Sequence, residues 1–148
     1  MIQRIQSVYL VLAVIALVTL FFPISFGDLK AGSTIAKTPA LSDGTLNLED
    51  NNLSMICTFA GIALFMAAIF LFKNRRLQTR IVALSMLVAL IIFILAGWLF
   101  MSSSKIAGND LSPGIGLGSP VIAILFGWLA NRSIRKDENL VRSMDRLR

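Results

Sequence analysis

Side chains able to do acid–base, nucleophilic or metal chemistry are scarce in this chain. The sequence has no histidine and a single cysteine, Cys57. A zinc site, a His-ligated haem and a disulfide within the chain therefore lack ligands. Asp28, Asp110 and the serines 102–104 are the closest approach to a hydrolytic cluster, but no general base accompanies them at a defined spacing. We therefore expect no catalytic residue, no metal site and no cofactor, and we do not expect an enzyme.

Three glycines at positions 114, 116 and 118 superficially resemble a phosphate-binding loop. A dinucleotide-binding fingerprint needs a preceding strand, a βαβ unit and a later acidic partner, and this sequence offers none of them. Helix packing is the better interpretation, because small residues four positions apart let another helix backbone approach closely. Such packing would occur within the chain or against a partner. The candidate packing residues are Gly114, Gly118, Ala123 and Gly127.

The elements that carry these residues are apolar and long. Hydrophobic residues make up 56% of the 148 residues, and the mean hydropathy is +0.78, which exceeds what soluble domains normally carry. Charged residues are clustered and leave four long uncharged runs. A helix rises ~1.5 Å per residue and the hydrocarbon core is ~30 Å thick, so each run can cross a membrane as a helix. The expected spans are about 5–23, 53–72, 81–101 and 115–131.

Two of these runs need further argument. A cleaved signal peptide is the alternative for the first one, but its apolar core is longer than the usual ~7–15 residues and residues 25–27 form a poor cleavage site. We therefore expect a retained helix. The fourth run contains Pro113 and Pro120, so its regular part is expected to begin near Gly116. Trp98 and Trp128 lie near opposite ends of their helices, as is typical of interfacial residues.

The distribution of positive charge predicts an orientation. The second and third runs are separated by KNRRLQTR, residues 73–80, a short segment with four positive charges and no acid. The positive-inside rule keeps such a segment in the cytoplasm. The inner side then holds eleven Lys and Arg and three acids, a net charge of +8. The outer loops 24–52 and 102–114 hold three Lys and five acids, a net charge of −2. The topology-setting residues are Lys73, Arg75, Arg76 and Arg80.

These observations predict one membrane domain over residues 1–148, an all-α integral membrane protein built as a four-helix transmembrane bundle. Both termini are expected in the cytoplasm. The outer loop 24–52 has a turn signal at 42–44 and strand-like alternation at its ends, which are compatible with a short hairpin or lid. A mobile polar connector is the slightly favoured interpretation.

The tail, residues 132–148, has the spacing of an amphipathic helix. Two interpretations compete: a helix lying on the anionic leaflet, and a docking helix for a cytoplasmic partner. Its acids argue against pure lipid adhesion and favour a protein partner. The candidate partner or lipid contacts are Arg135, Lys136, Asp137, Glu138, Leu140, Val141, Arg142, Met144, Asp145, Arg146, Leu147 and Arg148.

Three segments carry a resemblance to a known family. The opening MIQRIQSVYLVLA, the loop LFKNRRLQ and the ending NRSIRKDENLVRSMDRLR together resemble a bacterial family of small four-span inner-membrane proteins, a domain of unknown function. The similarity runs through the whole chain in order. It implies a multi-pass protein of the inner membrane of a Gram-negative lineage, and it transfers no site.

The polar side chains within the expected spans help to distinguish a transporter or channel from an accessory subunit. A transporter or channel needs ionisable or strongly polar groups at mid-membrane, whereas these spans offer only hydroxyls such as Thr19, Thr58 and Ser85. We therefore expect a non-catalytic accessory or scaffold subunit that associates with a larger membrane complex through its helices and tail. A small oligomeric channel or transporter component is the alternative. The expected partners are other membrane proteins and anionic lipid headgroups, with no nucleic acid, and a homo-oligomer stays open.

Overall fold

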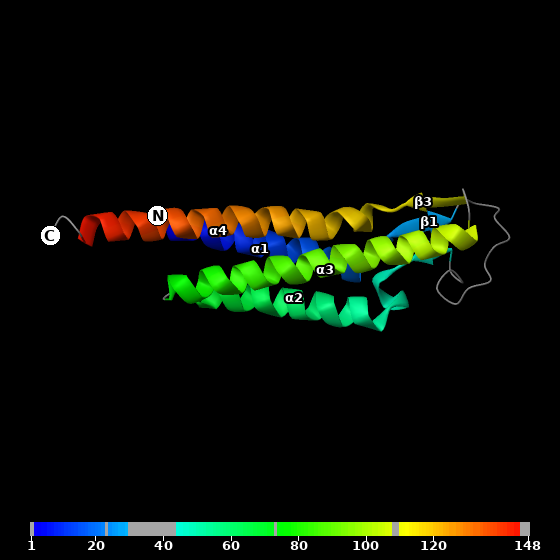
Figure 1. The fold of residues 1–148 in the computed structure, drawn as a ribbon, viewed down its shortest axis with the longest axis horizontal. Coiled ribbons are helices and arrows are strands. Elements are labelled where there is room, and N and C mark those ends of the chain that lie inside the picture. The colour runs from blue at the N-terminus through cyan, green and yellow to red at the C-terminus, as the bar shows by residue number, and fades with distance from the viewer. Residues whose placement is uncertain (1, 23, 30–43, 73, 108–109, 146–148) are drawn as a thin grey trace.

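The chain folds into four helices that lie side by side along its longest axis (Figure 1). The computed structural model describes residues 2–22, 24–29, 44–72, 74–107 and 110–145. Contacts join α1 to α4, α2 to α3, α3 to α4 and α1 to α2, so the four helices form one packed unit. The helices are α1, Ile2–Val18, followed by the 3-10 turn η1, Thr19–Phe21; α2, Asn52–Phe70; α3, Arg75–Ala107; and α4, Gly118–Asp145.

Three of these helices are long and apolar enough to cross a membrane. Within the described residues they are Asn52–Phe70, Arg75–Ile106 and Ile115–Leu140. The first helix is shorter, with an apolar stretch at Ile5–Phe21. Membrane-compatible helices are therefore confirmed for three of the four expected spans.

Two helices extend beyond the uncharged runs from which they were predicted. α3 has 33 residues and begins at Arg75, inside the segment 73–80 that was expected to be a loop. α4 has 28 residues and continues through Asn131 into the tail without a break. Arg, Lys, Gln and Glu are good helix formers, so a helix need not end where its apolar run ends. At ~1.5 Å per residue α3 is about 50 Å long, which exceeds the ~30 Å hydrocarbon core.

A small antiparallel sheet joins the two loops expected on the outer side. Its strands are β1, Gly27–Leu29, β2, Thr45–Leu46, and β3, Leu111–Pro113, in the order β2-β1-β3. The β1–β2 pairing follows the hairpin interpretation for the ends of loop 24–52; residues 30–43 lie outside the described residues. The sheet lies beside the C-terminal end of α3 (Figure 1). The fold is thus mostly helical rather than purely all-α.

Gly114 belongs to this sheet region rather than to a helix. Its N–H donates to the carbonyl of Phe26 at 2.9 Å. A Cβ at position 114 would lie 2.2 Å from the carbonyl oxygen of Ser25, so no side chain fits there. The glycine is required because the chain before β1 passes directly against it.

The other candidate packing residues lie in α4. A Cβ on Gly127 would lie 2.8 Å from Cγ of Met86 and 3.2 Å from Cε1 of Phe65, so α4 approaches α3 and α2 closely at this point. Ala123, one turn earlier, is fully buried. Gly118 has no neighbouring atom within 4 Å of its Cβ position, so it supports no close approach within the chain.

Large apolar side chains cover the outside of the helices. Phe70 is 71% exposed and Trp98 is 62% exposed, whereas much of the interior consists of Ala, Leu, Ser and Thr. Soluble proteins rarely expose continuous apolar surfaces of this kind. The described surface therefore suits a hydrocarbon environment.

The interior polar groups are satisfied mainly by nearby backbone. Thr58 Oγ1 donates to the carbonyl of Ser54 at 2.8 Å, and Ser85 Oγ donates to that of Ile81 at 2.8 Å. Two glutamines instead connect neighbouring helices. Gln78 Nε2 of α3 donates to the carbonyl of Ala68 in α2 at 3.0 Å. Gln6 Nε2 of α1 donates to that of Ser133 in α4 at 3.3 Å.

Candidate functional site at the charged end of helix α4

One end of the molecule gathers most of the described cations. The start of α1, the connection between α2 and α3, and the second half of α4 lie together there, and we call it the charged end (Figure 1). It brings the topology-setting arginines of α3 next to the predicted contact residues of α4, an arrangement that the sequence analysis did not anticipate. The cations at this end whose side chains the structure describes are Arg75, Arg76, Arg80, Arg132, Arg135 and Lys136.

Two ion pairs connect α3 to α4 at this end. Nη2 of Arg75 lies 3.1 Å from Oδ2 of Asp137, and the two side chains are only 27% and 12% exposed. The geometry of this contact is that of an ion pair rather than of a hydrogen bond, since Oδ2 is buried without a hydrogen-bond partner. Arg75 Nη1 donates instead to the backbone carbonyl of Asp137 at 3.3 Å.

The second ion pair is weaker. Nε of Arg76 lies 3.7 Å from Oε1 of Glu138, and the Arg76 side chain is 77% exposed. Water and salt screen such a pair strongly. Together the two pairs place an α3 arginine against each of the acids at positions 137 and 138. These acids therefore mark the side of α4 that faces α3.

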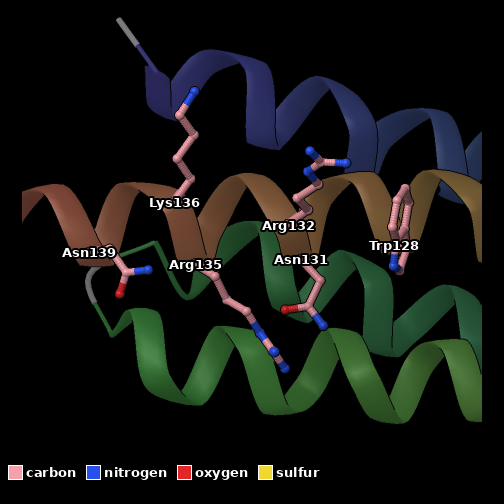
Figure 2. A pocket seen from close by; sticks show the side chains of 6 residues that line it. All are labelled: Trp128, Asn131, Arg132, Arg135, Lys136 and Asn139. Atoms are coloured by element: carbon pink, nitrogen blue, oxygen red, sulfur yellow. The ribbon is translucent and has the colours of Figure 1, made fainter.

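Three cations of α4 remain without an acidic partner in the described part of the chain. Arg132, Arg135 and Lys136 are all exposed, and they line a groove of about 540 Å³. Figure 2 shows Arg132 and Lys136 pointing to one side of α4 and Arg135 to the other. The other lining residues are Trp128, Asn131 and Asn139. The groove is therefore basic, with one aromatic side chain at its inner end.

Trp128 and Asn131 are the groove residues that are held in place by contacts or by burial. The guanidinium carbon of Arg132 lies 5.7 Å from the Trp128 ring centroid, a cation–π contact that orients the arginine. Asn131 is only 8% exposed, and its Oδ1 is buried without a hydrogen-bond partner. A buried amide without its full set of partners costs free energy, so it points to a polar role at this depth.

A second hollow of about 380 Å³ lies on the α3 side of the same helix. It is lined by Arg76, Thr79, Arg80, Arg135, Glu138 and Asn139. Arg135 and Asn139 line both hollows. Arg135 is therefore the cation that can reach an anion from either side of α4.

The remaining predicted contact residues lie further along the chain. Leu140 is 43% exposed. Val141, Arg142, Met144 and Asp145 lie in the last turns of α4. Arg146, Leu147 and Arg148, together with Lys73 of the predicted loop, lie outside the described residues.

Sequence analysis did not identify four residues of the groove as site residues: Trp128, Asn131, Arg132 and Asn139. The expected span ended at Asn131, which divided one helix face into a membrane part and a tail part. Their spacing of three and four residues across that boundary was the signal that could have joined them. Among the described residues no group of three His, Cys, Asp or Glu is placed to hold a metal ion.

Comparison with known proteins identifies a family for nearly the whole chain. The family model described as "Domain of unknown function (DUF4293)" matches residues 2–147. The resemblance to an uncharacterised domain family is thereby confirmed. No curated protein and no solved structure matches the chain.

Proposed function

Because the chain belongs to the DUF4293 family, a domain family of unknown function, we propose a function from its own geometry. The protein is a non-catalytic accessory or scaffold subunit of a larger complex in the bacterial inner membrane. Its four helices form a transmembrane bundle with both termini in the cytoplasm. Its docking element is the part of α4 that extends past the start of α3.

The exposed apolar surface and the charge distribution support the membrane part of this proposal. Phe59 and Phe70 of α2 and Leu125 of α4 are each more than half exposed. The cations of the charged end lie beyond these apolar surfaces, where a cytoplasmic leaflet and its headgroups would meet them. The sheet β2-β1-β3 then lies on the outer side.

The unbroken course of α4 is the observation that carries the docking role. A helix that lies flat on a leaflet must turn away from the span that precedes it, and sharp turns need a proline, a bulge or another break. α4 runs from Gly118 to Asp145 as one helix, and Arg75 holds Asp137 against α3 after the apolar run has ended. Residues 139–145 add about 10 Å beyond that contact at ~1.5 Å per residue. This extension projects into the cytoplasm, where a protein partner can reach it.

The alternative role, a channel or transporter component, has less support. The hydroxyls of Thr58 and Ser85 each donate to a carbonyl of their own helix at 2.8 Å. The hydroxyl of Thr19 donates to the carbonyl of Ala16 at 2.7 Å and lies 3.2 Å from the hydroxyl of Ser119. A hydroxyl used in this way is not free to line a solute path. Both ionic contacts between helices, moreover, lie at the charged end rather than at mid-membrane in the described part of the chain.

Purification with and without the extension tests the docking role. The full chain, extracted in mild detergent, should carry a second protein in a fixed ratio, and a chain ending at Asn139 should lose it. A matched control keeps the length and composition of residues 140–148 but scrambles their order, and it should lose the partner as well. Recovery of the full chain as a lone species would refute the proposal. Equal retention of the second protein by the shortened chain would refute the role of the extension.

A further inference from the structure

The exposed side chains on one face of α4 change from apolar to charged along the helix, as a phospholipid does from its acyl chains to its headgroup. Val121, Leu125 and Trp128 are 39%, 56% and 52% exposed and are spaced four and three residues apart. The same spacing continues to Arg132 and Lys136, which point to one side of α4. Arg135 points to the other side and lines the same groove. The face is therefore aliphatic first, aromatic next and basic last.

The order of these side chains matches the levels of a membrane leaflet. Aliphatic side chains suit acyl chains, tryptophan prefers the boundary between hydrocarbon and headgroups, and cations suit the phosphate level. Figure 2 shows Trp128 one turn before Arg132, with Arg135 and Lys136 following on the next turn. A ligand that is apolar at one end and anionic at the other would match the whole face.

Charge complementarity identifies the head of that ligand. The acids at 137 and 138 are already engaged by Arg75 and Arg76, so they leave the positive charge of the groove uncompensated among the described residues. Three cations within two turns of helix fit a phosphate, because guanidinium groups bind phosphate oxygens in pairs and an ammonium group adds a point charge.

The buried amide of Asn131 adds a neutral polar group to the lining of the groove. Its side chain is 8% exposed and its Oδ1 has no hydrogen-bond partner. An amide oxygen accepts and an amide nitrogen donates, and rotation of the amide exchanges the two. A headgroup that carries hydroxyls beside its phosphate would use this amide, whereas a bare phosphate would use only the cations.

We propose that this face of α4 binds one anionic phospholipid of the cytoplasmic leaflet, with a headgroup of the phosphatidylglycerol class. Its phosphate lies among Arg132, Arg135 and Lys136, and its acyl chains run along Leu125 and Val121. The site rests on the membrane orientation given under the proposed function, but it does not need the partner protein. It lies before the docking extension, at the level where α4 leaves the membrane.

Lipid-dependent stabilisation of the purified full chain tests the site. Phosphatidylglycerol added to the protein in neutral detergent should raise its Tm, and the same amount of phosphatidylcholine should not. Each cation near an anionic lipid is worth about a fivefold change in affinity, so replacing all three of the groove should weaken binding about 100-fold. The variant is R132Q/R135Q/K136Q. The single variant R135Q, which retains two cations, should weaken binding about fivefold and serves if the triple variant does not fold.

A control with the same loss of charge separates a site from general attraction. The variant R142Q/R146Q/R148Q removes three positive charges beyond the groove and should keep the phosphatidylglycerol response. Equal losses in the two triple variants would overturn the proposal, and so would equal responses to the two lipids. Glycerol 1-phosphate, which lacks acyl chains, should be ineffective at concentrations where the lipid acts. An equal response to it would show a phosphate site rather than a lipid site.

Two readouts separate this inference from the docking role. The chain ending at Asn139 retains every residue of the groove, so it should lose the partner protein and keep the lipid response. The triple groove variant should do the reverse. Loss of both properties in both variants would contradict the separation of the two surfaces along α4.

Discussion

The ion pair between Arg75 and Asp137 should be the strongest ionic link between α3 and α4. The charges lie 3.1 Å apart and both side chains are mostly buried. At an effective dielectric constant of ~20 the gross attraction at that distance is about 5 kcal/mol, most of which desolvation offsets. We expect a coupling free energy of about 1–2 kcal/mol between the two side chains.

The neighbouring pair, Arg76 and Glu138, provides a matched control on the same two helices. Its charges lie 3.7 Å apart, and Arg76 is 77% exposed. Exposed pairs of this kind usually contribute less than about 0.5 kcal/mol. The two pairs occupy adjacent positions on both helices, so they differ in burial and distance but not in the elements that they connect.

Double-mutant cycles measure both couplings. The variants are R75Q, D137N and their double mutant, and R76Q, E138Q and theirs, with the free energy of unfolding followed by SDS titration in mixed micelles. The hydrogen bond from Arg75 to the backbone carbonyl of Asp137 does not involve the carboxylate, so D137N isolates the charge. Raising the salt concentration should reduce the outer coupling more than the inner one. Couplings that agree within about 0.3 kcal/mol, the usual limit of additivity, would refute the reasoning from burial.

Two further predictions concern helix packing and orientation. Gly127→Ala places a Cβ 2.8 Å from Cγ of Met86 and should lower the free energy of unfolding in micelles by about 1–3 kcal/mol. Gly97→Ala, which meets open space in α3, should be neutral or stabilising by up to about 1 kcal/mol, and equal losses in both variants would contradict the close approach at Gly127. Replacing the four cations of residues 73–80 by glutamate should disturb insertion, as measured by labelling introduced cysteines from each side of the membrane in a chain without Cys57; an unchanged labelling pattern would contradict the proposed orientation.

The helical elements could be predicted from the sequence, whereas their ends could not. The length of an uncharged run reflects the thickness of the hydrocarbon core that it must cross, not the point at which the helical backbone ends. Helix ends depend on local propensity and capping. The segment at 75–80 has three Arg and one Gln but no Gly or Pro, so α3 begins within it. The same reasoning explains why α4 passes Asn131 without a break.

The glycine pattern shows a second limit of sequence reasoning. Gly114, Gly118 and Gly127 have similar small-residue spacing, yet the structure gives them three different surroundings. Gly114 lies against the backbone of Ser25, Gly118 faces open space, and Gly127 contacts α3 and α2. Spacing along one helix identifies which residues are small on one face, but only the neighbouring chain decides which of them must be small.

The position of α3 changes how the acids of the tail are interpreted. Taken along the sequence, Asp137 and Glu138 dilute the positive charge of the tail and argue against contact with an anionic leaflet. In the structure Arg75 and Arg76 lie against them, and Arg132 and Lys136 point to another side of α4. The mixed charge of the segment is therefore sorted by side: ion pairs where α4 meets α3, and uncompensated positive charge along the groove. Because of this sorting, one straight helix can bind a leaflet near Trp128 to Lys136 and still present a separate surface to a protein beyond Asn139.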